Sequence, residues 1–304
     1  MTQSPSSAKI ANVVYHDWEA ESYDSKWSIS FDERCVEYAR HAFDAASDSQ
    51  LNLPVDRAVE IGAGTGFFLL NLMQSGVARH GVVTDISSGM VRTAVRQAGD
   101  LGLDVVGTVA DAESLPLADD SCDLVVGHAV LHHIPDVERA MTEVLRILRP
   151  GGRFVITGEP TRRGDYVARR LSRLTWWVTS HVTQAPGLRG RWARLPAELE
   201  ESSEAAALEA VVDVHTFDPG ELARTCLRAG AVDVRTHTSE LTASWFGWPV
   251  RTFEAAVKPG ALGFGWAMFA YRTWQGLARL DESVLARIVP DELFYNVSVS
   301  GAKP

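Results

Sequence analysis

The feature that most restricts the fold of this 304-residue chain is a glycine-rich turn between two apolar runs. Val59-Glu-Ile-Gly-Ala-Gly-Thr-Gly66 places Gly62, Gly64 and Gly66 between a short apolar run and Phe67-Phe-Leu-Leu-Asn-Leu-Met73, which has helical spacing. Glycines let the backbone pass close beneath a ligand, and the first N–H groups of a helix have no partner within that helix. The turn therefore predicts a strand, a ligand-binding loop and a helix, the first unit of an open α/β sheet.

Strand-like and helix-like patterns alternate after this turn. The expected strands are 57–61, 81–84, 103–109, 122–126 and 153–157, and the expected helices are 67–73, 89–98 and 137–148. We expect the last helix to be closed by a turn at Arg149-Pro-Gly-Gly152. Two later strands are expected at 231–238 and 294–300, the first preceded by a helix that Asp218 caps and Pro219 begins. Such alternation predicts an α/β protein with a mostly parallel sheet and helices on both faces.

We interpret the chain as one domain with additions. Residues 1–50 would form an N-terminal lid, 51–160 the cofactor-binding core, and 217–240 with 291–304 the end of the core sheet. Residues 161–216 would be a helical insertion that includes an alanine-rich helix at 202–212. Residues 241–290, rich in Trp, Phe and Gly, would form a helical cap between the last two strands.

Composition limits the partners and the compartment. A net charge of −10 and a pI near 5.4 argue against nucleic acid as a partner. Cys35, Cys122 and Cys226 are far apart, so we expect reduced thiols, a cytoplasmic location and no metal site. No run has the apolar length of a signal peptide core or a transmembrane helix.

Three acidic residues lie at or just after the ends of successive expected strands, and they indicate the chemistry of the ligand. Glu60 lies inside the end of the first strand, where a carboxylate suits a ligand with positive charge, such as a sulfonium with an α-amino group. Asp85, at the end of the second strand, can accept hydrogen bonds from both ribose hydroxyls. Asp111, after the third strand, can accept one from an adenine amino group. The GxGxG spacing and Glu60 argue against a nicotinamide-dependent oxidoreductase.

This ordered set resembles the class I S-adenosylmethionine-dependent methyltransferases, and among them the small-molecule branch typified by quinone-biosynthesis enzymes. The matching motifs are Glu60-Ile-Gly-Ala-Gly-Thr-Gly66, Asp85, Asp111-Ala112, Leu115-Pro-Leu117, Leu131-His-His-Ile134, Leu148-Arg-Pro-Gly-Gly152 and, in the lid, Tyr15-His-Asp-Trp18 before Tyr23-Asp24. The resemblance implies a Rossmann-like seven-stranded sheet, with an N-terminal helical lid and a helical insertion between the last two strands. It also implies S-adenosylmethionine as the cofactor.

The resemblance further implies which residues contact the cofactor. Gly62 and Gly64 would face its methionine part, Asp85 the ribose, and Asp111 with Ala112 the adenine edge. The full implied set is Tyr23, Glu60, Gly62, Ala63, Gly64, Gly66, Asp85, Ile86, Met90, Asp111, Ala112 and His128. The alternative is that Glu60 and Asp111 are helix-capping or ion-paired acids and that Met90 is core.

Candidate catalytic histidines follow the fourth strand. A general base is needed only if the acceptor is a hydroxyl or an acidic carbon. His133 is our candidate base, and His128 would lie under the sulfonium. The alternative is that Leu131-His-His-Ile134 begins the next helix, with one imidazole as its cap. We favour that alternative for His132.

The aromatic residues predict a small acceptor that is aromatic or lipophilic. The candidate acceptor residues are Tyr15, Trp18 and Trp27 in the lid and Trp245, Trp248, Phe264 and Trp266 in the cap. The sequence thus predicts methyl transfer to an O, N or C atom of that acceptor. The alternative is a protein of this fold that transfers no methyl group, such as a regulator or a cyclase. The eight arginines between 162 and 194 would meet an acidic acceptor, a membrane surface or, as we favour, only solvent.

Overall fold

The computed structural model describes residues 5–20, 23–24, 29–47, 51–195 and 214–304. The helix predicted at 202–212 and Trp27 lie outside the described residues, and so does the side chain of Trp18. The chain divides into two compact units. The core unit comprises residues 1–159, 211–237 and 298–304, and the helical unit comprises 160–210 and 238–297.

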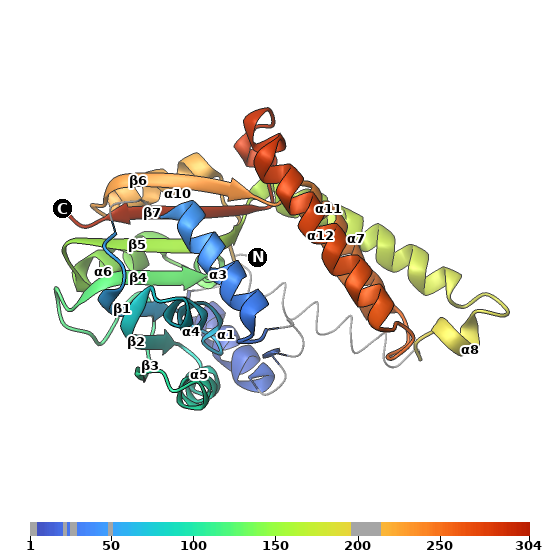
Figure 1. Ribbon diagram of the computed structural model, residues 1–304, viewed down its shortest axis with the longest axis horizontal. Coiled ribbons are helices and arrows are strands. Elements are labelled where there is room, and N and C mark those ends of the chain that lie inside the picture. Colours follow the sequence, from blue (N-terminus) through green and yellow to red (C-terminus); the bar gives the residue numbers. More distant parts are fainter. Residues whose placement is uncertain (1–4, 21–22, 25–28, 48–50, 196–213) are drawn as a thin grey trace. The chain divides into compact units, whose positions relative to one another are not determined.

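A seven-stranded mixed sheet confirms the predicted fold class. Its strands are β1 (Val55–Ile61), β2 (Ala78–Asp85), β3 (Val105–Val109), β4 (Cys122–His128), β5 (Leu148–Pro160), β6 (Val232–Ser239) and β7 (Asn296–Ala302). They lie in the order β3-β2-β1-β4-β5-β7-β6, and β1 to β5 pair in parallel (Figure 1). β7 runs antiparallel to its neighbours. Two backbone hydrogen bonds show this direction: the amide of Gly151 donates to the carbonyl of Lys303 at one end of β5, and the amide of Thr161 donates to the carbonyl of Tyr295 at the other.

Helices cover both faces of this sheet (Figure 1). They are α1 (Pro5–Glu19), α3 (Glu33–Ala46), α4 (Phe67–Gln74), α5 (Ser88–Asp100), α6 (Val137–Ile147) and α10 (Pro219–Arg228). α3 packs on α4 over β1, and their contact buries Phe43, Phe68 and Leu72. α6 packs against α10. Asp218 caps α10 and Pro219 stands in its first turn, as the sequence predicts.

The turn predicted at Arg149–Gly152 is wrong in detail. α6 ends at Ile147 and β5 begins at Leu148, so the four residues belong to the strand. Cys122 pairs with Leu148 and Leu124 with Arg153, which leaves extra residues on β5 as a bulge. Gly151 accommodates the bulge with a φ of 75°.

The helical unit contains the insertion predicted between the last two strands. Its helices are α7 (Arg162–Val182), α8 (Arg189–Trp192), α11 (Thr242–Ala256) and α12 (Phe264–Ser283), with short 3₁₀ turns η2 (Leu285–Arg287) and η3 (Asp291–Leu293). α11 packs against both α7 and α12. Over the described part of the chain, no helix combines the length and the apolar character needed to cross a bilayer.

Candidate cofactor and acceptor site

The glycine loop joins β1 to α4 and takes a backbone path that favours glycine. Gly62, Gly64 and Gly66 have φ angles of 55°, 52° and 89°. A Cβ on Gly62 would lie 2.0 Å from Cγ2 of Val130, so this position is closed by packing. A Cβ on Gly64 would meet only the Tyr23 ring, at 3.9 Å. The open side of the loop is therefore at Gly64, on the side lined by Tyr23.

Two buried carboxylates stand beside this loop. Glu60 accepts a hydrogen bond from the amide of Leu69 at 3.1 Å, in the first turn of α4, so it has the capping contact that we considered as an alternative. Asp85 accepts from the amides of Gly64 (2.9 Å) and Ser87 (2.8 Å). Burial raises the pKa of Glu60 well above its usual value and that of Asp85 to about 6. A cationic ligand group would offset this by favouring the charged forms.

The residues therefore fit S-adenosylmethionine. An approachable loop backbone lies next to two buried acids, and this suits a ligand with a positive centre and hydroxyl donors. Three further predicted contacts lie in the loop, just after β2 and in the first turn of α5. Ala63 and Met90 are buried, and Ile86 directly follows Asp85 at the end of β2.

The lid is attached to the loop and to α5 by two acids of the predicted lid motif, Asp17 and Asp24, to which the sequence assigned no contact. Asp17 accepts from Ser87 Oγ at 2.5 Å and from the Gly89 amide at 2.8 Å. Asp24 accepts from Thr65 Oγ1 and from Gln97 Nε2, each at 2.6 Å. No local pattern could predict these contacts, because the partners are 41 to 73 positions apart.

Asp111, predicted at the adenine edge, forms an ion pair with the lid. Lys9 Nζ lies 2.7 Å from Asp111 Oδ2 and 2.6 Å from Glu113 Oε2. The ion-paired alternative for Asp111 is thus observed. Because the partner is in α1, this ion pair also places the lid over the segment that contains Asp111 and Ala112.

His128 lies at the end of β4 in an aromatic surrounding. Its ring centre is 5.4 Å from those of Phe67 and Phe68 and 6.1 Å from that of Tyr38. Burial lowers the pKa of His128 to about 4, so the ring is neutral near pH 7 and a weak proton acceptor. We therefore keep His128 as a cofactor-side residue rather than as a base.

His132 and His133 form a pair of rings in contact, tilted by 44° to each other, next to a buried acid. His132 Nδ1 lies 2.9 Å from Glu159 Oε2, and Glu159 also accepts from the amides of Val130, Leu131 and His132. The His133 ring centre is 3.9 Å from that of His132 and 5.5 Å from that of His16. Leu131–His133 form a separate 3₁₀ turn and Asp136 caps α6, so the alternative is wrong in expecting an imidazole to cap that helix.

The candidate acceptor residues are divided between the two units. Tyr15 is buried in the core unit with its ring 5.1 Å from that of His16. In the helical unit, Trp248 packs on Tyr295 at 5.4 Å, and Trp266 Nε1 donates to Glu254 at 2.7 Å. Phe264 is 81% exposed and Trp245 41%.

Comparison with known proteins identifies the class of the core. Residues 59–156 match the family model described as "Methyltransferase domain". A malonyl-[acyl-carrier protein] O-methyltransferase of Methylococcus capsulatus is 38% identical over 114 residues, which are 36% of this chain and 41% of that protein. A demethylmenaquinone methyltransferase of Clavibacter sepedonicus is 39% identical over 102 residues, 33% of this chain and 40% of that one. The chain thus spans about two fifths of the length of these curated relatives.

Solved structures agree on the fold. A SAM-dependent methyltransferase of Thermotoga maritima has a TM-score of 0.52 at 17% identity, covering 95% of this chain and 99% of that one. The [4+2]-cyclase SpnF has a TM-score of 0.52 at 18% identity, covering 88% and 81%. The chain contains a class I S-adenosylmethionine-dependent methyltransferase domain. The predicted resemblance and the predicted cofactor are confirmed for this core.

Proposed function

We propose that this protein, in the cytoplasm, transfers the methyl group of S-adenosylmethionine to an O, N or C atom of a small lipophilic acceptor. The observation that carries the proposal is the pair of buried carboxylates, Glu60 and Asp85, beside the open backbone of Gly64. Their raised pKa values favour a ligand that brings positive charge and hydroxyl donors to the same place.

Each residue of the site has a proposed task. When bound, S-adenosylmethionine supplies a methyl group that is already activated by the sulfonium. Asp85 would hold the ribose hydroxyls, Asp111 and Ala112 the adenine edge, and Gly64 with Tyr23 the methionine part. His128 and the rings around it would exclude water from the methyl group.

For an acceptor that must lose a proton, we propose the His132–His133 pair as the base. A carboxylate at Nδ1, as Glu159 is for His132, fixes the tautomer in which Nε2 takes up the proton. This geometry favours His132 as the proton acceptor over His133, which the sequence favoured. His132→Gln should then lower kcat by about 100-fold or more and leave cofactor affinity unchanged, whereas His133→Gln should have the smaller effect.

The acceptor class rests on two kinds of support. Aromatic side chains gather in the helical unit, and the relatives' names refer to a quinone precursor and an acyl-carrier-bound malonyl group. We propose Tyr15, Trp18, Trp27, Trp245, Trp248, Phe264 and Trp266 as acceptor residues. Trp248→Ala should raise the KM for the acceptor without changing the Kd for the cofactor.

The test is calorimetric titration with S-adenosylmethionine, S-adenosylhomocysteine and, separately, NADH. We expect binding of the first two only, lost in Asp85→Ala and kept in Asp100→Ala, an exposed acid at the end of α5.

Lipophilic phenols, quinones and polyketides are then supplied with S-adenosylmethionine, and the masses of the products are measured by mass spectrometry. A mass gain of one methyl group with matching S-adenosylhomocysteine supports transfer. Tight cofactor binding without turnover on any acceptor would favour the regulator or cyclase.

A further inference from the structure

The outward face of α7 reverses the usual pattern of a surface helix. Its side toward the rest of the helical unit has small buried residues, among them Ala168 and Thr179. Its exposed side has Tyr166, Leu174 and Trp177, of which Trp177 is 60% exposed. A surface helix normally buries its large apolar residues, so this arrangement indicates that something else contacts the exposed side.

Two arginines lie between these apolar residues along the same stripe. At 100° per residue, Tyr166, Arg170, Arg173, Leu174 and Trp177 fall on one side of the helix. All five are exposed, and the Arg170 guanidinium lies over the Tyr166 ring at 4.4 Å from its centre. We call these five residues the α7 stripe.

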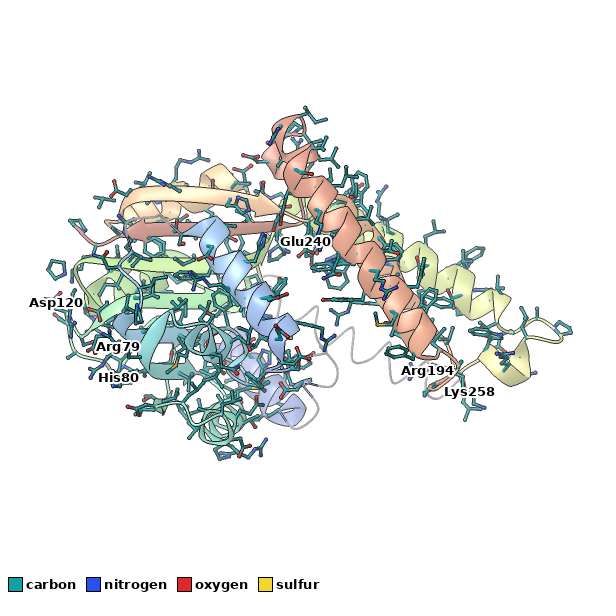
Figure 2. All side chains as sticks on the ribbon, viewed as in Figure 1. Arg79, His80, Asp120, Arg194, Glu240 and Lys258 are labelled. Atoms are coloured by element: carbon teal, nitrogen blue, oxygen red, sulfur yellow. The ribbon has the colours of Figure 1, made fainter. Side chains whose placement is uncertain are left out.

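The pattern continues at the far end of α7. Leu188, Arg189, Arg191 and Leu195 are exposed around α8. The amide of Lys258 donates to Trp192, so Lys258 lies at the same end of the helical unit, where Figure 2 labels it beside Arg194. Between residues 161 and 195 the sequence has eight arginines and one acid, Asp165, although the whole chain has a net charge of −10.

Within the described part of the chain, exposed aromatic rings are confined to the helical unit. Among the described residues, the large aromatic side chains that are exposed all belong to the helical unit, and they are Tyr166, Trp177, Trp245, Phe264 and Phe269. A lipophilic acceptor would account for aromatic rings but not for the exposed arginines that lie between Tyr166 and Trp177 on the same side of α7. A bilayer with anionic headgroups accounts for both, because rings enter the interface while arginines meet phosphates.

From this charge complementarity we propose that the α7 stripe, with the basic end at α8, binds the surface of an anionic membrane. The helix lies along the interface and does not cross it. This binding is independent of methyl transfer, so it can be tested whether or not the proposed function holds.

The test is flotation of the full chain with vesicles. One set is phosphatidylcholine alone, and the other has part of it replaced by phosphatidylglycerol. We expect binding to the anionic set only, reduced by added salt. The double variant Arg170→Gln, Arg173→Gln should bind about 30-fold more weakly, and Trp177→Ala should also weaken binding.

The matched control is Arg224→Gln, Arg228→Gln, which removes two exposed arginines from one helix, α10, of the core unit. Five glutamates occur between 198 and 209, and their negative charge would compete with anionic lipid for the arginines. Every variant therefore keeps the full chain, so that this competition is the same in all of them. Circular dichroism and cofactor titration check that each variant is folded.

Three results of the vesicle experiment would overturn the proposal. One is a lack of binding to anionic vesicles, and another is equal binding to both vesicle sets. The third is equal loss of binding in the α10 control and the α7 variant. Light scattering tests whether a second copy of the chain, and not a membrane, covers the α7 stripe. If the protein is a dimer that the α7 variants dissociate, the stripe belongs to a second copy of the chain and not to a membrane.

Discussion

Asp85 gives the protein a stability that should depend on pH in a defined direction. Its carboxyl is buried at the end of β2, and burial raises its pKa from 3.8 to about 6 in the folded protein. A folded pKa above the unfolded one means that the carboxyl favours folding only while it is protonated. The folded protein therefore loses stability as the pH rises from about 4 to about 6, and the loss is complete above that range.

The size of this loss follows from the shift. About two pKa units correspond to about 3 kcal/mol of unfolding free energy. Asp85→Asn removes the titration, so its stability relative to the wild type should improve by about 3 kcal/mol between about pH 4 and pH 8. Asp85→Asn also changes the unfolding free energy by an amount that does not depend on pH. Asparagine has one acceptor oxygen for the amides of Gly64 and Ser87, which costs about 1–3 kcal/mol at every pH.

We would measure the unfolding free energy of the cofactor-free protein from hydrogen exchange of the β1 and β2 amides at increasing urea concentration, repeated at several pH values. These strands belong to the core unit, so the signal is not mixed with unfolding of the helical unit. Asp100→Asn, an exposed acid on α5, is the control. A difference between wild type and Asp85→Asn that stays constant with pH would refute the reasoning. The same variant should bind S-adenosylmethionine more weakly at every pH, which would show that the carboxylate is kept for function despite its cost.

Two further substitutions test the packing around the site and in the helical unit. Gly62→Ala should destabilise the core by at least about 2 kcal/mol more than Gly64→Ala, since both have positive φ but only the first Cβ meets Val130; equal urea midpoints for the two would contradict this. Asp281→Ala should cost about 3 kcal/mol and speed proteolysis of α11, because its carboxylate accepts from the amides of residues 241, 242 and 243; an unchanged cleavage rate would show that water replaces these bonds.

Local signals predicted the fold better than they predicted the site. The sequence alone indicates features that depend on neighbouring residues. These are the apolar runs of the strands, the glycine loop and the start of α10 at Asp218 and Pro219. The bulge at Gly151 is different, because the register between β4 and β5 decides whether these residues turn or stay in the strand. The start of α6 at Val137 was predicted from its amphipathic period, but its cap, Asp136, was not identified.

Long-range contacts account for most of what the sequence could not show. Lys9, Asp17 and Asp24 attach the lid to residues 41 to 104 positions away, and the lid motif that contains the two acids does not indicate which residues they contact. Glu159 likewise lies near the end of β5 without any motif, yet its carboxylate contacts His132. The helical unit shows the same limit, since its aromatic residues are evident in the sequence but their exposure is not.

The position of β7 also has a consequence for synthesis. β6 pairs only with β7, and β7 follows α11 and α12 in the sequence. During translation β6 therefore emerges with no strand to join, and β5 keeps an open edge, until residues 296–302 have left the ribosome. The sheet is completed from the middle by its last strand. We expect truncations before residue 296 to leave two exposed strand edges and to aggregate, even though every residue of the glycine loop is present.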